Sequence, residues 1–234
     1  MKRIRKTHPP SDLSNWIKTQ VKLKLDCSYN ALCGKPEHIS LKKQLLKEQG
    51  YLCAYTGIRI EEETCHVEHL KPQNICKTEK DERKVKKLYL DDVEYRNMVA
   101  CFPEDGGDKS HGYGAPIKGG WWNEVEFVSP CQEDCERRFS YKMAGKISPS
   151  DKNDVAASKT IEVIGLNAQG LIDKRKRNIL GFFGLGRNSK KKLSKDDAQE
   201  FLENIGKPDS TGKLRQFCFV YEQLLPNYIK NLQS

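Results

Sequence analysis

The sequence lacks a long hydrophobic run and an apolar N-terminal leader. No stretch of about 18 consecutive apolar residues occurs, which excludes a membrane-spanning segment and predicts no membrane association. The N-terminus, MKRIRKTHPPSDL, is basic but has no apolar stretch of the kind that a secretory signal peptide needs. These two absences predict a cytoplasmic location. The sequence also contains no internal repeat, which excludes a solenoid or another repeat architecture.

Cysteine and positive charge, in contrast, are plentiful. The chain has nine cysteines, an odd number, and in a cytoplasmic protein such thiols stay reduced or bind metal rather than form disulfides. The formal net charge is +9, from 41 basic and 32 acidic residues. An excess of this size fits a polyanionic partner such as nucleic acid, although many proteins with this charge bind none.

Apolar periodicity and turn residues predict a mixture of helices and short strands. A helix is expected after Pro10, and another over residues 38–49, with Ser40 as its N-cap and Leu41, Leu45 and Leu46 buried. The stretch YLCAYTGIRI predicts a hairpin that turns near Thr56 and Gly57. Further predictions are strands on either side of Ala144–Gly145, helices over 168–183, 194–206 and 214–232, a solvated segment over 77–92, and a linker over 187–197.

A short polar stretch, CHVEHLKPQN at residues 65–74, carries the chemistry of interest. Hydrolysis of a phosphodiester needs a base to activate water and a metal to neutralise the scissile phosphate. Histidine suits the first role, since its pKa lies near neutrality, and a carboxylate suits the second. Glu68 and His69 supply this pair on neighbouring positions of a predicted strand, and Asn97 and His111 follow further along the chain.

The order of an acidic residue, histidine, asparagine and histidine resembles the motif of HNH nucleases. The resemblance extends through LLKEQGYLCAYTG, HVEHLKPQ, YRNMVACF, the KSHGYG…KGG passage, FSYKMAGKI and IEVIGLNAQGLIDKRKR, and covers about residues 1–180. This order is similar to the PtuB family, the HNH nucleases of Septu anti-phage systems that are also found as retron-associated effectors. The resemblance implies an α+β fold, in which N- and C-terminal helices decorate a ββα-metal core.

The resemblance also implies a role for each motif residue. His69 would be the general base, Glu68 and His111 would ligate the metal, and Asn97 would fix the loop and orient the base. The metal would be one divalent ion, Mg²⁺ or Mn²⁺, with Zn²⁺ as a further candidate. The gap from Asn97 to His111 exceeds that of the compact motif, so Asp105 or Asp108 is an alternative third ligand.

Three segments are expected: a basic helical segment at 1–49, the nuclease core with its following strands at 50–150, and a helical region at 151–234. The family implies a bacterial host and a PtuA-like ATPase partner that binds the C-terminal helices or the basic N-terminus. A retron reverse transcriptase with its msDNA is a further candidate partner. DNA is the favoured substrate and tRNA the alternative. The predicted phosphate contacts are Lys174, Arg175, Lys176 and Arg177.

Two other interpretations of the same residues remain open. Thiolates and imidazoles at this density suit zinc, so Cys65, His66, His69 and Cys76 are candidates for a structural zinc knuckle. The protein would then be a catalytically silent adaptor that binds nucleic acid and the ATPase. The paired CxxC zinc site of many HNH proteins is not expected, because Thr56 follows Cys53 where the second thiolate would stand. His66 is expected to be structural rather than a ligand.

Overall fold

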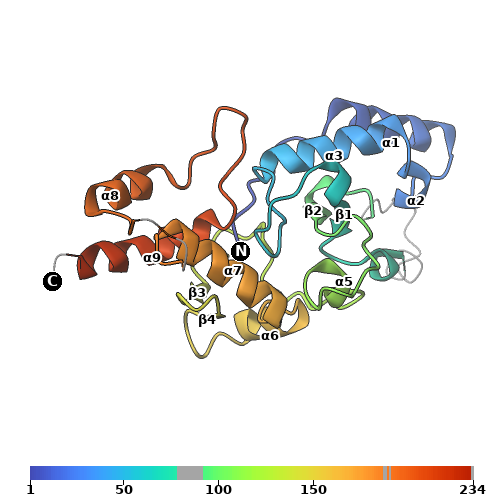
Figure 1. Cartoon of the computed structure of the whole chain (residues 1–234). Helices are drawn as coiled ribbons and strands as arrows, with labels where there is room; N and C mark the ends of the chain where they lie inside the picture. The colour runs from blue at the N-terminus through green and yellow to red at the C-terminus, as the bar shows by residue number, and fades with distance from the viewer. Residues whose placement is uncertain (78–91, 187–188, 190, 233–234) are drawn as a thin grey trace.

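A computed structural model gives the structure of residues 1–77, 92–186, 189 and 191–232. The fold is a mixture of helices and two small antiparallel sheets, each of two strands, so the predicted α+β class is confirmed at this level. Figure 1 shows α1 and α3 above the sheet of β1 and β2 and α2 beside it, with α8 and α9 on the far side of the molecule. Most of the predicted solvated segment and part of the predicted linker lie outside the described residues.

The helices and strands are joined by segments of very different length. In chain order they are α1 (Ser11–Leu23), α2 (Tyr29–Leu32), α3 (Pro36–Glu48), η1 (Glu62–Thr64), β1 (His66–His69), η2 (Tyr95–Asn97), β2 (Met98–Cys101), α5 (Ala115–Lys118), β3 (Phe139–Tyr141), β4 (Ile147–Pro149), α6 (Val155–Val163), α7 (Gln169–Phe182), α8 (Lys195–Asn204) and α9 (Cys218–Asn231).

The sheet of β1 and β2 lies at the centre of the N-terminal half. The strands pair antiparallel, with Glu68 opposite Val99 and His69 opposite Met98. All four residues of β2 are buried, whereas β1 alternates between partly exposed and buried side chains. Because successive side chains of a strand point to opposite faces, Glu68 shares a face with His66, and His69 lies on the other face.

Helix α3 covers this sheet and is joined to it by a side chain. It buries Leu41, Leu45 and Leu46 as predicted. The predicted N-cap at Ser40 is wrong, because the helix begins four residues earlier at Pro36, where a fixed φ favours the first turn. Just after the helix, the buried amide of Gln49 donates to the Ala100 oxygen at 2.8 Å and accepts from the Ala100 nitrogen at 2.7 Å. These bonds fix α3 against β2.

The predicted hairpin at residues 51–60 is present as a turn rather than as two strands. Its pairing is reduced to one bridge between Leu52 and Arg59. Gly57 has φ +73°, and a β-carbon added there would lie 2.5 Å from the ring of Phe219. Only glycine tolerates both this backbone conformation and this close approach. The hairpin turn therefore lies directly against α9.

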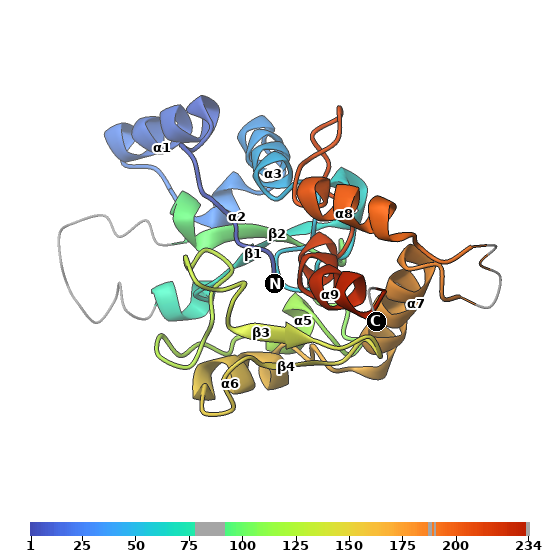
Figure 2. The same ribbon diagram turned by 90° about the vertical axis from the view of Figure 1, so that its left-hand side faces the viewer.

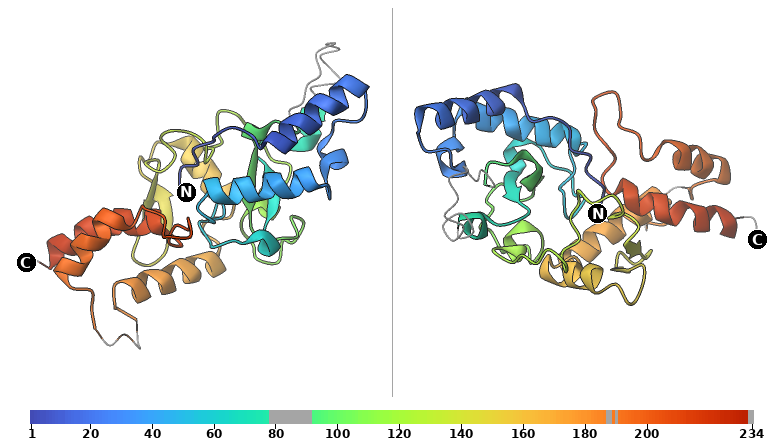
Figure 3. Two further views of the ribbon diagram at one scale, coloured as in Figure 1. Left: turned by 90° about the horizontal axis from the view of Figure 1, so that it is seen from above. Right: turned by 180° about the vertical axis from the view of Figure 1, so that it is seen from behind.

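The C-terminal half follows the sequence prediction closely. Strands β3 and β4 pair around Gly145, which has φ +83°. Helix α8 is capped by Ser194, whose hydroxyl accepts from the Asp197 nitrogen at 3.2 Å. Figures 2 and 3 show α7 and α9 passing beside the β3–β4 sheet. In the described part of the chain, no helix has the length and apolar character that crossing a bilayer requires.

Candidate active site

His69, the last residue of β1, is a buried imidazole that is held in one orientation. The residue is 4% exposed, and its Nε2 lies 2.8 Å from the backbone oxygen of Asp92. A carbonyl oxygen only accepts hydrogen bonds, so Nε2 carries the proton and the lone pair resides on Nδ1. Burial lowers the pKa of His69, which favours the neutral form. Nδ1 is therefore the hydrogen-bond acceptor of the ring, and the Gln73 amide nitrogen donates to it at 3.4 Å.

Tyr29 and Asp92 hold this imidazole from the side of α2. The Tyr29 ring meets the His69 ring edge to face, with centroids 4.6 Å apart. The Tyr29 nitrogen donates to the Asp92 carboxylate at 2.9 Å, and its hydroxyl lies 2.8 Å from His38 Nε2. The backbone that accepts from His69 is therefore itself fixed by the first residue of α2.

Glu68, on the opposite face of β1, is paired with a buried lysine. Lys118, the last residue of α5, donates to Glu68 Oε1 at 2.9 Å and to the His69 oxygen at 3.1 Å. The Lys118 side chain is fully buried, and that of Glu68 is 16% exposed. The Tyr55 hydroxyl also reaches Glu68 Oε1, at 3.4 Å. Lys118 thus neutralises Oε1, whereas Oε2 is directed toward His66.

His66 lies next to this second carboxylate oxygen. Its Nε2 is 3.9 Å from Glu68 Oε2, and its Nδ1 contacts the backbone oxygen of Pro103. A carbonyl oxygen only accepts, so Nδ1 carries a proton, and Nε2 is the ring nitrogen that faces the carboxylate. An imidazole nitrogen and a carboxylate oxygen at this separation are donors that suit a divalent ion. The structure therefore pairs Glu68 with His66.

Asn97 clamps the loop that follows β1. Its side-chain oxygen accepts from the Lys71 nitrogen at 2.8 Å, and its side-chain nitrogen donates to the Lys71 oxygen at 3.0 Å. Its own backbone oxygen accepts from the Leu70 nitrogen at 2.8 Å. These three bonds continue the β1–β2 pairing beyond His69, and they restrain the chain on the C-terminal side of the imidazole.

His111 lies apart from these residues. Its ring packs between Phe102 and Tyr113, with centroids 4.8 and 5.8 Å away, and its Nε2 is 3.7 Å from Asp108 Oδ2. No contact among the described residues joins His111 to Glu68 or His69. Asp105, the other alternative ligand, accepts from the Gly107 nitrogen in its own turn. Glu68 and His69 are thus neighbours in β1 with side chains on opposite faces, Asn97 bonds to the loop that follows them, and His111 contacts none of the three among the described residues.

The cysteines of the zinc interpretation have separate surroundings. Cys76 lies 3.6 Å from the Lys71 oxygen, while His66 and His69 point to opposite faces of β1. Within the ranges that the structure describes, no group of three or more histidine, cysteine or acidic side chains is arranged to hold a metal. Cys53 and Cys101, by contrast, are hydrogen-bonded neighbours. Burial alone would raise the pKa of Cys53, but bonds from Cys101, Thr56 and Phe102 lower it to about 6.

One of the four predicted phosphate contacts on α7 needs a correction. Arg175 is 2% exposed, and its guanidinium donates to the backbone oxygens of Gly145, at 2.7 Å, and Leu166. It joins α7 to the β3–β4 turn and is not available to a phosphate. Lys176 and Arg177 are exposed, and Lys174 is half-buried with its ammonium 5.9 Å from the Phe102 ring. A run of basic residues on a helix necessarily turns one of them inward.

Sequence reasoning missed Lys118, Tyr29 and Asp92. Lys118 stands beside Ala115, Pro116 and Ile117, and a lysine among small and apolar residues was the one signal of its burial. Tyr29 and Asp92 carry no local signal, because their role depends on contacts with His69 from distant positions in the chain. A comparison of the chain with protein-family models gives no match, and a search of curated proteins gives none either.

Proposed function

We propose that the protein is a metal-dependent endonuclease of the HNH type, which hydrolyses phosphodiester bonds of nucleic acid, with DNA as the favoured substrate. The observation that carries the proposal is the state of His69. Its proton is directed to the Asp92 oxygen, its pKa is lowered by burial, and Nδ1 retains a lone pair. A general base for water needs these features, because it must be neutral and correctly turned before substrate arrives.

In this mechanism His69 Nδ1 accepts a proton from the attacking water. The water oxygen bonds to phosphorus in line with the 3′ oxygen, which leaves. Asp92 holds the ring through Nε2, and Asn97 restrains the loop after the strand. The roles are therefore separate, since His69 moves the proton and the other two residues prevent its ring from turning away.

A divalent ion, when bound, would neutralise charge on the scissile phosphate and on the leaving oxygen. Glu68 would hold it through Oε2, since Lys118 occupies the other oxygen. His66 Nε2, 3.9 Å from that oxygen, fits as a second donor, in addition to the predicted His111. Mg²⁺ is commonly held by one or two carboxylates together with water and phosphate, so a small protein donor set is sufficient.

The wider setting follows from the resemblance to PtuB. The nuclease would act in anti-phage defence in the bacterial cytoplasm, with a PtuA-like ATPase that restrains it. A tRNA target in a retron-linked system, with the reverse transcriptase and msDNA present, is the alternative within the same enzyme class. The net charge of +9 favours either nucleic acid and does not discriminate between them.

The test is cleavage of labelled duplex DNA and of a tRNA pool with Mg²⁺ or Mn²⁺, alone and with the ATPase. We compare the native chain with His69→Ala, and use His8→Ala as a matched control because His8 is exposed. Cleavage should require metal, disappear in His69→Ala and persist in His8→Ala. The substrate that is cut decides between DNA and RNA.

Two further variants assign the metal ligands. Cleavage by His66→Ala and by His111→Ala is measured as Mn²⁺ is titrated. The true ligand is the histidine whose loss raises the Mn²⁺ concentration needed for cleavage. If His69→Ala cleaves as well as the native chain, His69 is not the general base and the HNH mechanism is wrong. If neither protein cleaves and both bind nucleic acid equally, the result favours the silent adaptor.

A further inference from the structure

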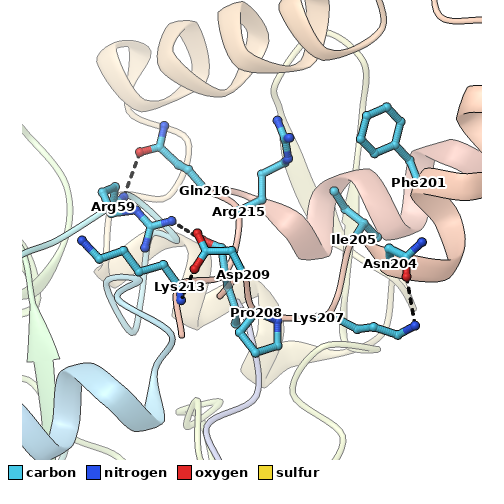
Figure 4. Close-up of a pocket in the computed structure, with 11 residues that line it drawn as sticks. Arg59, Phe201, Asn204, Ile205, Lys207, Pro208, Asp209, Lys213, Arg215 and Gln216 are labelled. Atoms are coloured by element: carbon cyan, nitrogen blue, oxygen red, sulfur yellow. Dashed lines mark hydrogen bonds between the residues drawn. The ribbon is translucent and has the colours of Figure 1, made fainter. Parts of the chain in front are cut away.

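A basic groove lies between α7, α8 and the segment that leads into α9. It consists of two cavities of about 570 and 520 Å³, both widely open to solvent, which share Arg215 as a common wall. Figure 4 shows Arg215 projecting into the space between α8 and the segment around Gln216. The basic side chains that line the groove are Arg59, Arg177, Lys207, Lys213 and Arg215.

Two of these side chains have no polar partner in the described part of the chain. The Arg215 guanidinium lies 5.7 Å from the ring centroids of both Phe182 and Phe201, without a hydrogen bond or ion pair. Arg177 is exposed on α7 and likewise makes no such bond to the described residues. A guanidinium that packs against aromatic rings keeps its N–H donors available for phosphate oxygens.

The other basic residues are partly neutralised, but the acidic groups do not fill the groove. Lys213 pairs with Glu61 at 2.7 Å, and Arg59 donates to the backbone oxygens of Gly50 and Tyr51. Asp209 is the one acidic residue among those that line the two cavities. Its carboxylate accepts from the Thr211 and Lys213 nitrogens at 2.8 and 3.0 Å, so its turn already satisfies it.

We infer that this groove binds the phosphate backbone of a nucleic-acid strand at a place separate from the candidate active site. Arginine forks match phosphate oxygens, and two cavities joined at one arginine suit successive phosphates of a strand better than one small anion. The inference rests on the proposed function only for the choice of nucleic acid as the ligand. Figures 1 and 3 place α8 and α9 on the far side of the molecule from α1 and α2.

The groove would therefore extend the contact with substrate well beyond the bond that is cut. Asn178 and Gln216 join its two sides, since the Gln216 amide donates to Asn178 Oδ1 at 3.2 Å. This bond connects α7 to the segment before α9 next to both arginines. The basic side chains from separate parts of the chain are thus held on one supporting structure.

The test is fluorescence anisotropy of a labelled oligonucleotide in EDTA, where no cleavage occurs. We compare the native chain with Arg177→Ala/Arg215→Ala and with the control Lys18→Ala/Lys22→Ala, which removes two exposed charges from α1. The groove variant should bind about tenfold more weakly. The slope of its log binding constant against log salt concentration should become less steep by about 1.4–1.8, the value for two phosphate contacts. The control variant should lose less than half as much binding free energy as the groove variant, and its salt slope should change by less than half as much.

Arg215→Lys and Arg177→Ala as single variants keep the test valid if the double variant does not fold. Equal losses in the groove variant and the α1 control would overturn the inference, because charge alone would explain them. A mononucleotide that competes as well as an unlabelled strand would overturn the assignment to a strand. If binding depends on the groove residues but the native chain cuts no nucleic acid, only the proposed function is refuted. If the native chain cleaves nucleic acid but binding does not depend on the groove residues, only this inference is refuted.

Discussion

The ammonium of Lys118 lies 2.9 Å from Glu68 Oε1, and the lysine side chain that carries it is fully buried. The same nitrogen donates to the backbone oxygen of His69, so one side chain contacts both residues of the Glu68–His69 pair. A buried charge is tolerated only when an opposite charge and hydrogen-bond partners surround it. Lys118 and Glu68 therefore depend on each other, and α5 is fixed to the end of β1.

Lys118→Met should destabilise the protein by about 3 kcal/mol, because Glu68 would keep a charge without its main partner. Urea denaturation of the variant measures this. Lys118→Met/Glu68→Gln should recover part of the loss, since the remaining amide carries no charge. A double variant less stable than Lys118→Met would contradict the pairing.

Asn97→Asp should weaken both folding and cleavage. The carboxylate can still accept from the Lys71 nitrogen, but it cannot donate to the Lys71 oxygen and would repel it. We expect a loss of about 2 kcal/mol in unfolding free energy. Cleavage should fall by about tenfold or more, because the loop after His69 is no longer restrained. Asn15→Asp on exposed α1 is the control, and equal effects in the two variants would argue against a clamp.

Arg175→Met should cost about 3 kcal/mol, because the buried oxygens of Gly145 and Leu166 would lose their donor. Lys176→Met, one residue on, should change stability by less than about 0.5 kcal/mol, since that side chain is exposed. Thermal unfolding of the two variants makes the comparison. Nucleic-acid binding that decreases in folded Arg175→Met would restore this residue as a phosphate contact.

The Arg138 guanidinium, which bonds to both carboxylate oxygens of Asp154, lowers the pKa of that aspartate below its ordinary value. Between the folded and unfolded pKa values the unfolded chain binds more protons, so stability rises with pH in that range. The contribution is complete above the unfolded value of about 3.9 and is lost as pH falls through the folded value. Asp154→Asn keeps the helix cap but removes this contribution.

Denaturation at about pH 6 and about pH 3, on either side of the ordinary aspartate pKa, should therefore show a larger loss of stability in the native chain than in Asp154→Asn. Asp12→Asn, an exposed position on α1, is the matched control and should leave the pH dependence nearly unchanged. If native and Asp154→Asn proteins lose the same stability between these two values, the ion pair does not lower the pKa of the carboxyl.

Local sequence signals predict those elements whose stability is mostly local. The cap at Ser194, the turn at Gly145 and the apolar stripe of α3 each depend on residues within a few positions of one another. The N-cap prediction at Ser40 fails because Pro36, which starts the helix earlier, outweighs a serine in its second turn. The 51–60 hairpin has a predictable turn, but α9 covers it and its strands shorten to one bridge.

The candidate site is predictable only in part, for a related reason. Glu68 and His69 are successive residues of one strand, so their proximity and their opposite directions follow from the sequence alone. The partners that decide their chemistry come from α2, from Asp92 and from α5, at separations that no local pattern encodes. The sequence predicts a structural role for His66. Only the structure of β1 shows that His66 and Glu68 share a face of the strand and that the imidazole lies next to the Glu68 carboxylate.

The close approach of Gly57 to Phe219 has a consequence for how the protein can be divided. The Leu214 nitrogen donates to the Gly50 oxygen at 3.0 Å, and the Phe217 nitrogen donates to the Gly57 oxygen at 3.2 Å. The last helix and the hairpin before β1 therefore share one hydrophobic interior. A chain truncated before α8 would lose that interior along with any partner surface on α8 and α9. We expect the protein to melt in one calorimetric transition, so that point variants on the surface of α8 are better probes of a partner than truncations.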